Sequence, residues 1–482
     1  MTPTRRSLLG AAAASAAVAA LPFDRAFAAA AADWALAVAD VGGDLPLRSL
    51  RLIHGRAPAG LTGTLYRNGP ARFTRGDTRA HWFDGDGLVR AFRIRDGNAT
   101  LAGRFVDTPK RRADEAAGAI VTPGFGTAGA ASARISGPDD LNAANTSVLA
   151  LGDRLWALWE GGSPTAVDPR TLETRGPVRL SDETAGAPFL AHPRVEPDGR
   201  VWNLGLSGDR AIVWRLSAAG ELEAATPIQL PRACYLHDFT ATERELILVL
   251  QPWIQEQFQL PVMEGLRWRP ELGTVVLVLD KDDLGKRRVF ELPPLAFFHL
   301  GDAWREADGT IRFDGCFAPD VRHVSDDIGA MARGEPFVSR PQHLGMIVLG
   351  ADGRARIDWT RAVAEFPQTD RRRAGLARRF TWHVTGDSRP LPRGLAVTDW
   401  RKERTETFDF GGRQVVEEAV FVPRPGSTAE GDGWLVGTTV NLAARATELH
   451  VFEASRLDAG PVCTWRADVA LPAGFHGTFV PA

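Results

Sequence analysis

The sequence has few cysteines, and their spacing excludes two classes of site. Its 482 residues include only three, Cys234, Cys316 and Cys463, and no CxxC pair. Three thiols can form at most one disulfide, so the chain is not a disulfide scaffold, and the lack of paired spacing excludes a thiolate metal site. We expect all three to be buried as small apolar side chains.

Charge imbalance and motifs for organic cofactors are also missing. The formal net charge at pH 7 is −2, so no basic excess would attract nucleic acid. The basic run Arg371–Arg373 is short, and we expect it in a solvated loop. The glycine-rich pieces lie in expected hairpins and not between a strand and a helix. The sequence therefore has no motif for a flavin, a nicotinamide, a haem or another organic cofactor.

The one long apolar run lies at the N-terminus and predicts a targeting segment. Thr4–Leu9 contains a twin-arginine pair, an alanine-rich run continues to about Phe23, and Ala26–Ala28 has the small-x-small pattern of a cleavage site. We predict that residues 1–28 are a twin-arginine signal peptide and that residues 29–482 form a single domain, exported already folded to a bacterial periplasm. The alternative is an uncleaved anchor, but the run is weakly hydrophobic and short for a spanning helix.

After this segment, short apolar or alternating runs are separated by turn residues. Runs of this kind, bounded by Gly, Pro or Asp-Gly pairs, predict β-strands. The clearest are Arg154–Glu160, Val201–Leu206, Ala211–Leu216, Leu246–Leu250, Thr274–Leu279, Met346–Leu349 and Trp434–Val440. Four pairs predict hairpin turns, namely Asp96-Gly97, Asp198-Gly199, Asp308-Gly309 and Asp352-Gly353.

Helical periodicity is scarce in the same part of the chain. Weak helices are predicted only at Ile328–Arg333 and Arg361–Glu365. No Gly/Ser-rich or Pro-rich linker divides the chain, which favours one large all-β domain over several small ones. A closed ring of short sheets leaves few exposed strand edges, so the pattern favours a β-propeller. No strict repeat gives the number of blades.

Four of the ten histidines share an unusual setting. Each follows or ends an apolar run beside a proline, a glycine or an aromatic residue, in Ala191–Arg194, Leu236–Phe239, Phe297–Leu300 and Gly474–Gly477. Local zinc motifs place their ligands a few residues apart, whereas these four histidines are spread over positions 192 to 476. It suits a propeller, whose inner strands converge on one axis. A shared metal is one interpretation of this spacing, and ordinary core or surface histidines are the other.

The four motifs resemble the ligand motifs of carotenoid cleavage oxygenases. Gly63–Pro70, His81–Gly87 and Pro270–Thr274 also resemble stretches of that family, and the matches run in the family's order from about residue 45 to 480. The resemblance implies a seven-bladed β-propeller with loops forming a cap over the site. It also implies one Fe(II) per chain, held by His192, His237, His299 and His476.

Three glutamates fall in matching positions, Glu160 in Trp159–Gly162, Glu365 in Ala364–Pro367 and Glu418 in Glu418–Pro423. The resemblance implies that each accepts a hydrogen bond from the outer nitrogen of one ligand histidine. Such a carboxylate fixes the tautomer and direction of the ring and makes it a better donor. It would also offset the charge of a ferrous ion with four neutral ligands.

Other residues near these motifs are expected to be structural. Glu417 would point to the other face of a strand from Glu418. His81 would be a hydrogen-bonding core residue, and Asp84–Gly87 would form a tight turn that joins two strands. The remaining histidines are expected to be ordinary surface or core residues, and they are His54, His323, His343, His383 and His450.

The resemblance also implies the reaction. An iron with four nitrogen ligands keeps open positions for O2, and without an organic cofactor the electrons must come from the substrate. The family reaction is scission of a conjugated C=C bond by O2 into two carbonyl products, and we expect it here. No side chain needs to act as a general acid or base, so no catalytic residue is predicted beyond the iron site.

The expected partners are O2 and an apolar polyene, a carotenoid or apocarotenoid. The family also has a branch that cleaves stilbenes, in which a lysine before the first glutamate and an upstream tyrosine bind the phenol. Trp159 stands at the lysine position, and the only tyrosines, Tyr66 and Tyr235, lie outside the expected region, about Ala113 to Ala133. A stilbene or phenylpropene substrate is therefore the alternative.

The chain has 24 Phe and 14 Trp, enough to line an apolar tunnel as well as a core. Trp159, Phe298 and Phe475 are the predicted tunnel residues, because they adjoin proposed iron-site residues. Gln251–Met263 resembles the family's apolar entrance patch, which implies a peripheral membrane contact.

One position departs from the family pattern, since Asp302 stands where asparagine is usual. A different class of function would be a non-catalytic propeller that binds apolar ligands. The presence of all four histidines and all three glutamates argues against that class.

Overall fold

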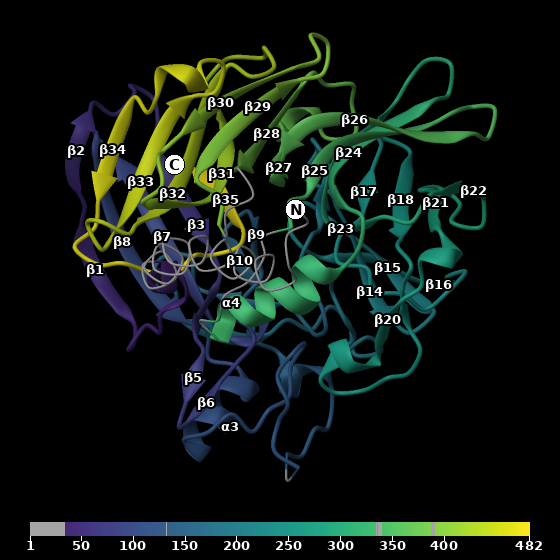
Figure 1. Cartoon of the computed structure of the whole chain (residues 1–482), viewed down its shortest axis with the longest axis horizontal. Coiled ribbons are helices and arrows are strands. Elements are labelled where there is room, and N and C mark those ends of the chain that lie inside the picture. Colours follow the sequence, from purple (N-terminus) through teal and green to yellow (C-terminus); the bar gives the residue numbers. More distant parts are fainter. Residues whose placement is uncertain (1–33, 132, 334, 336–339, 387–390) are drawn as a thin grey trace, which may run out of the picture.

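The computed structural model describes residues 34–131, 133–333, 335, 340–386 and 391–482, and the predicted signal peptide lies outside these residues. Regular structure in the described part is almost entirely β (Figure 1). Its two α-helices are short, α3 (Pro109–Ala117) and α4 (Gly329–Arg333). Among the described residues, no helix is long and apolar enough to cross a membrane.

Seven antiparallel sheets surround one axis as the blades of a propeller, which confirms the predicted fold class. The innermost strands of six of the seven blades contact one another in sequence around the ring, and several of them surround the centre in Figure 1. These seven strands are β9 (Ser147–Leu151), β13 (Arg194–Val195), β17 (Thr240–Ala241), β23 (Ala296–Arg305), β27 (Glu365–Gln368), β31 (Gln414–Pro423) and β35 (Gly477–Pro481).

Five blades are built from consecutive stretches of the chain, each running outward from its inner strand. Their outer strands are β10 (Arg154–Leu158), β11 (Thr165–Val167) and β12 (Thr174–Pro177); β14 (Val201–Ser207), β15 (Arg210–Leu216) and β16 (Leu222–Gln229); β18 (Glu245–Leu250), β21 (Thr274–Asp280) and β22 (Arg287–Leu292); β24 (Ile311–Ala318), β25 (His343–Leu349) and β26 (Ala355–Val363); and β28 (Phe380–Thr385), β29 (Gly394–Asp399) and β30 (Arg404–Asp409).

The other two blades join the two ends of the chain. In one, C-terminal β35 pairs with β3 (Gly63–Arg67), with Leu65 opposite Phe479. That blade continues through β7 (Asp86–Arg95) and β8 (Asn98–Phe105) to β1 (Leu45–Ser49). In the other, β31 is followed by β32 (Gly433–Asn441), β33 (Ala446–Glu453) and β34 (Cys463–Arg466), and β2 (Arg51–Gly55) forms the edge. The pairing of β35, the last strand, with β3, from the N-terminal part of the chain, closes the ring. His476 directly precedes β35.

The predicted strands form because buried apolar runs alternate with turns. Leu246–Leu250 is buried at every position, as expected for a strand packed on both faces. All four predicted Asp-Gly pairs turn between adjacent strands, and their glycines have φ between 77° and 89°. The three cysteines are buried and free, as predicted.

Two local predictions are wrong. Arg361–Glu365 is not a helix, because it spans the end of β26 and the start of β27. Asp84–Gly87 is not a turn between two strands. A 3-10 turn, η2 (Trp82–Asp84), leads directly into β7. The Asp84 carboxylate accepts hydrogen bonds from the backbone N–H groups of Phe125 and Gly126, which tie η2 to a distant loop.

Several inserted segments are not part of the blades. In Figure 1, α3 and the β5–β6 hairpin lie at the edge of the ring, and α4 crosses in front of it. The inserted segments include β5 (Thr74–Arg75), β6 (Thr78–Arg79), the short pair β19 (Trp253–Gln255) and β20 (Leu266–Trp268), and a π-helix, η6 (His323–Ile328). The predicted helix at Ile328–Arg333 is confirmed as α4, which follows η6 directly.

Candidate metal centre

Four histidines meet on the axis of the propeller. His299 lies within inner strand β23, while His192, His237 and His476 lie one to three residues before the inner strands β13, β17 and β35. One ring nitrogen of each lies within 4.8 Å of the others, so the structure brings together the whole predicted set. His192 Nε2 lies 3.0 Å from His237 Nε2, and His476 Nε2 lies 3.1 Å from His299 Nε2.

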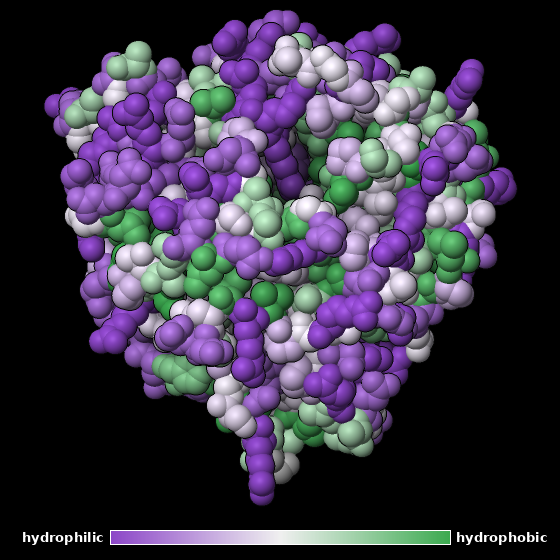
Figure 2. Space-filling view, turned by 180° about the vertical axis from the view of Figure 1, so that it is seen from behind, coloured by the Kyte–Doolittle hydropathy of each residue, from purple (hydrophilic) through white to green (hydrophobic). Residues whose placement is uncertain are grey.

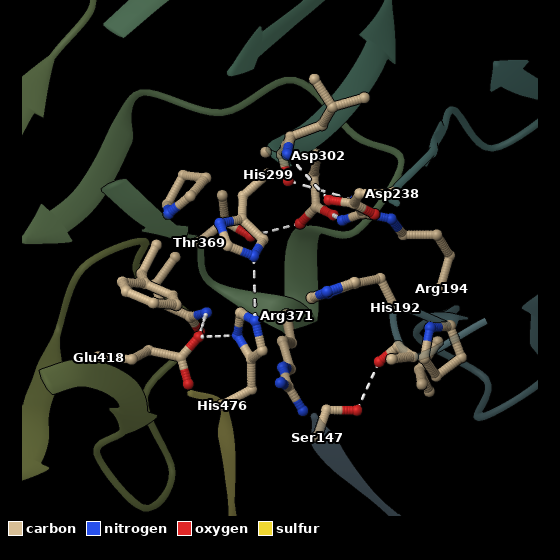
Figure 3. Close-up of a pocket in the computed structure, with 18 of the residues that line it drawn as sticks. Ser147, His192, Arg194, Asp238, His299, Asp302, Thr369, Arg371, Glu418 and His476 are labelled. Atoms are coloured by element: carbon tan, nitrogen blue, oxygen red, sulfur yellow. Dashed lines mark hydrogen bonds and ion pairs between the residues drawn. The ribbon is translucent and has the colours of Figure 1, made fainter. Parts of the chain in front are cut away.

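A carboxylate lies behind three of the four rings, and the three carboxylates belong to the predicted glutamates. His237 Nδ1 donates to Glu160 Oε2 at 2.5 Å, and His476 Nδ1 donates to Glu418 Oε1 at 2.9 Å (Figure 3). His299 Nδ1 makes the equivalent contact with Glu365. Glu417, next to Glu418, points elsewhere, toward Thr438 and the buried guanidinium groups of Arg67 and Arg90.

This arrangement fits a metal ion. Because three rings place their Nδ1 proton on a carboxylate, their Nε2 atoms carry lone pairs. Two lone pairs about 3 Å apart repel each other unless a cation lies between them. Imidazole–metal bonds of about 2.1 Å meeting at a right angle place two donor atoms about 3.0 Å apart, which matches the observed separations. Imidazole suits iron, copper, nickel and zinc alike, so the donors alone do not select the metal.

Burial and neighbouring charges set the protonation of the rings. Burial lowers the pKa of His192 well below its usual value, and the three other imidazoles lower it further. Burial also lowers the pKa of His476, more than Glu418 raises it. At His299, burial lowers the pKa, but Glu365 and other carboxylates more than offset this and leave the pKa raised. Of these three rings, His192, which lacks a carboxylate partner among the described contacts, is the one whose pKa lies well below its usual value.

Each supporting carboxylate is itself held by a second donor. Glu418 accepts hydrogen bonds from Gln368 Nε2 at 2.8 Å and from the Gly477 N–H at 2.7 Å. Glu365 accepts from the Phe366 N–H at 2.6 Å. The second donor to Glu160 is the hydroxyl of Tyr235, at 2.6 Å. The sequence interpretation missed Tyr235, although residues two apart on an extended segment share a face and Tyr235 precedes His237 by two.

An aromatic cluster lies on one side of the four rings. Its members are Phe83, Phe125, Tyr235, Trp253, Phe298 and Phe475. The centroids of neighbouring rings in this cluster are 4.9 to 6.0 Å apart. Phe298 also lies 4.7 Å from the ring of His237. Two of the three predicted tunnel residues, Phe298 and Phe475, thus share one cluster, while Trp159 packs over Gly161 and Gly162.

A polar cavity of about 130 Å³ lies against His192, His299 and His476. Its charged groups include Arg194, Asp238, Asp302 and Arg371 (Figure 3). Arg194 donates to Asp238 Oδ1 at 2.7 Å and lies 3.4 Å from Asp302 Oδ1, so Asp302 takes part in a charge network. One face of the molecule is hollowed, and hydrophilic residues reach into the hollow (Figure 2).

The basic run Arg371–Arg373, predicted as a solvated loop, forms the 3-10 helix η7, in which Arg371 is exposed as predicted. Arg371 lines the polar cavity and donates a hydrogen bond to Thr478 Oγ1 at 2.9 Å. Arg372 is also held, by both oxygens of Asp370. A basic run in the sequence does not show that one of its guanidinium groups lines a cavity at the axis.

Two different environments therefore border the four histidines. Tyr235, Phe298 and Phe475, which lie one or two residues before His237, His299 and His476, belong to the aromatic cluster. Arg194 and Asp238, which lie one or two residues after His192 and His237, line the polar cavity. The arrangement allows an apolar molecule and small polar species to approach the same centre from different sides.

Comparisons with known proteins agree with this geometry. Residues 39–481 match the family model described as retinal pigment epithelial membrane protein. The chain is 27% identical over 451 residues to an isoeugenol monooxygenase of Pseudomonas putida, covering 88% of this chain and 93% of that protein. It is 29% identical over 469 residues to an apocarotenoid-15,15'-oxygenase of Synechocystis, covering 89% of this chain and 92% of that protein.

The fold is also similar to a solved structure. The crystal structure of the cobalt-substituted Synechocystis ACO superposes with a TM-score of 0.85 and 24% identity, covering 94% of this chain and 99% of that one.

Proposed function

The chain belongs to this family, the carotenoid cleavage oxygenases, and we propose that it cleaves a conjugated C=C bond of a carotenoid or apocarotenoid with O2 to give two carbonyl products. The observation that carries the proposal is the convergence of four imidazole nitrogens between an aromatic cluster and a polar cavity. An apolar alkene and O2 can both reach such a centre.

The proposed cofactor is one Fe(II) per chain, held by His192, His237, His299 and His476. When bound, it would supply the redox chemistry that lets O2 react with an alkene. The protein contributes position and charge: Glu160, Glu365 and Glu418 fix the directions of three rings through their Nδ1–H groups. The aromatic cluster excludes water from one side and would hold the alkene there. No proton transfer by a side chain is required.

A polyene is the favoured substrate because the groups expected to bind a phenol are missing. Trp159 stands where the stilbene branch of the family has lysine, and its ring covers Gly161 and Gly162. Phe298 and Phe475 offer π-faces to an extended conjugated chain. Both are more than nine-tenths buried, so they are available only to a molecule that enters the interior.

A phenolic alkene is the second candidate substrate, and two observations favour it. One relative bears the name isoeugenol monooxygenase, and isoeugenol is a phenolic alkene. In addition, Tyr235 brings a hydroxyl to the edge of the aromatic cluster, where it contacts Glu160. Against this candidate, the Tyr235 hydroxyl already donates its hydrogen bond to the Glu160 carboxylate.

We also propose export and a peripheral membrane contact. The twin-arginine pattern in residues 1–28 supports folding and metal loading before export to the periplasm. Within Gln251–Met263, Trp253 is buried against the aromatic cluster, whereas Phe258 is 78% exposed. The exposed Phe258 lies on the segment that resembles the family's entrance patch, and together these two features support contact with a lipid surface, the source of an apolar substrate.

The experiment that tests the function is incubation of the mature, Fe(II)-loaded protein under O2. An apocarotenal, a full-length carotenoid and a hydroxystilbene are offered together, and products are identified by HPLC and mass spectrometry. Shortened polyene aldehydes support the proposal, and benzaldehydes alone favour the second candidate. No product from iron-loaded protein would overturn both and favour a propeller that only binds apolar ligands. The His299→Ala variant, which lacks one proposed ligand, is the negative control.

A further inference from the structure

Two buried histidines outside the metal centre each have a ring nitrogen without a hydrogen-bond partner. They are His81, which precedes η2, and His323, the first residue of η6, and each side chain is more than nine-tenths buried. In both, the free atom is Nε2. A buried polar atom without a partner is costly, and an unexplained one points to a water or ligand that completes it.

The contacts of the other ring nitrogen fix the tautomer of each residue. His323 Nδ1 lies 3.1 Å from the carbonyl oxygen of Asp320, which can only accept, so Nδ1 carries the proton and Nε2 is an acceptor. His81 Nδ1 accepts the backbone N–H of Phe83 at 3.2 Å, so its Nε2 carries the proton and is a donor. Burial lowers the pKa of both imidazoles, which keeps them neutral.

Both rings pack against the aromatic cluster. His323 meets Phe298 edge to face at 5.9 Å, and Phe298 in turn contacts His237. His81 lies 5.1 Å from Phe83 and 5.8 Å from Phe125. The elements that carry them are also neighbours, because η2 contacts α4, the continuation of η6. An unused acceptor and an unused donor are therefore placed around the cluster that faces the metal centre.

Two other polar side chains lie at the aromatic cluster, and only one of them already has a hydrogen-bond partner. The hydroxyl of Tyr235 is occupied by Glu160. Trp82 Nε1, beside Phe475, is a further buried donor without a partner. The unused set is thus one acceptor and two donors. A hydroxyl group can pair with the acceptor or with either donor, because it has one proton to donate and two lone pairs to accept. A carbonyl would leave the His323 acceptor unpaired, and a hydrocarbon would leave all three.

We propose that His323, through its unpartnered Nε2, recognises a hydroxyl group on the otherwise apolar substrate, and that His81 is a second unpartnered polar group on the same aromatic cluster. The site would make the protein selective for a hydroxylated polyene over the corresponding hydrocarbon. This inference rests on the proposed function for the identity of the ligand, but it concerns binding and not cleavage. Sites built to hydrogen-bond a substrate hydroxyl discriminate strongly against analogues that lack it, because their own polar groups are then left unpaired.

The test compares the binding of a matched pair of ligands to the iron-loaded protein without O2. The ligands are two apocarotenals of equal length, one with a ring hydroxyl and one without, and binding is followed by quenching of tryptophan fluorescence. We expect the wild-type protein to bind the hydroxylated ligand about tenfold more tightly. His323→Phe keeps an aromatic ring but removes the acceptor, and we expect it to lose that preference while it still binds the hydrocarbon ligand.

His383→Phe is the matched control, because His383 is also buried but both of its ring nitrogens have partners, Val384 O and Thr398 Oγ1. It should keep the wild-type preference. Equal affinities in the wild-type protein would mean that only an ordered water completes the two rings, and would overturn the inference without any variant. A preference that persists in His323→Phe would also overturn it. If the preference is found but neither ligand is cleaved under O2, the inference stands and the proposed function fails.

Discussion

The Tyr235 hydroxyl donates a hydrogen bond to Glu160 Oε1 at 2.6 Å, while Glu160 Oε2 accepts from His237 Nδ1 at 2.5 Å. The same phenol ring packs against Phe125 and Trp253 in the aromatic cluster. Glu365 and Glu418 each accept a backbone N–H as well as a histidine. Among the described contacts Glu160 accepts none, so Tyr235 is what holds its second oxygen.

Tyr235→Phe should therefore weaken metal binding. Without the hydroxyl, Glu160 can turn away from His237, and changes of this kind behind a ligand typically cost about tenfold or more in metal affinity. Competition with a chelator measures the affinity, and the visible spectrum of the cobalt-loaded protein reports the ligand geometry. Tyr66→Phe is the matched control, because the Tyr66 hydroxyl donates to Pro169 O at 2.8 Å, away from the centre. Equal effects of the two variants would contradict this role.

Glu417→Gln should lower the stability of the protein, whereas Glu418→Gln should lower its metal affinity. Glu418→Gln removes the anion behind His476 and should lower metal affinity by about 10- to 100-fold with little loss of stability in the metal-free protein. Glu417→Gln leaves the buried Arg67 and Arg90 without their carboxylate, which should cost about 3 kcal/mol of stability or more. Denaturant unfolding and metal titration of both variants separate the two outcomes. The same loss in both assays for both variants would contradict the assignment.

Removal of the metal should destabilise the protein. Four imidazoles from four blades meet at the centre, so a bound ion ties those blades together and stabilises only the folded chain. At free metal about 100-fold above the dissociation constant, the stabilisation is about 2.7 kcal/mol. Chelator-treated protein should unfold at a lower temperature, and Fe(II) should restore the original value. His299→Ala protein should show a smaller response to the metal, and an unchanged wild-type midpoint would argue against a bound ion at this centre.

The sequence predicted the strands and the four histidines well, for a physical reason. Buried runs such as Leu246–Leu250 and glycines that adopt positive φ after aspartate are local signals, and both have the predicted structure. The histidines stood out because Pro, Gly and aromatic neighbours set them apart from ordinary surface positions. Their convergence depends on the closure of the ring, which no local pattern contains, so it was the resemblance that predicted it.

Local sequence patterns did not reveal residues whose role depends on where the side chain points. Tyr235 was set aside because the expected phenol-binding tyrosine lies elsewhere in the sequence, yet its hydroxyl reaches Glu160. Arg371 belongs to a basic run, but the chain turns at η7 (Arg371–Arg373) and places this one side chain at the axis. Arg361–Glu365 has helical spacing, but pairing with β25 and β28 overrides it.

Stability should fall as the pH drops from 6.5 to 4, because two further histidines are buried in neutral form. Burial lowers the pKa of His383 and of His450 to about 4, whereas in the unfolded chain both titrate near 6.5. Between these values the unfolded state binds protons that the folded state does not, so unfolding becomes easier by up to about 3 kcal/mol per histidine. His450→Gln cannot take up this proton and should show a shallower decline in urea unfolding between pH 7 and pH 4.5. An identical decline would mean that His450 is protonated in the folded protein as readily as in the unfolded one.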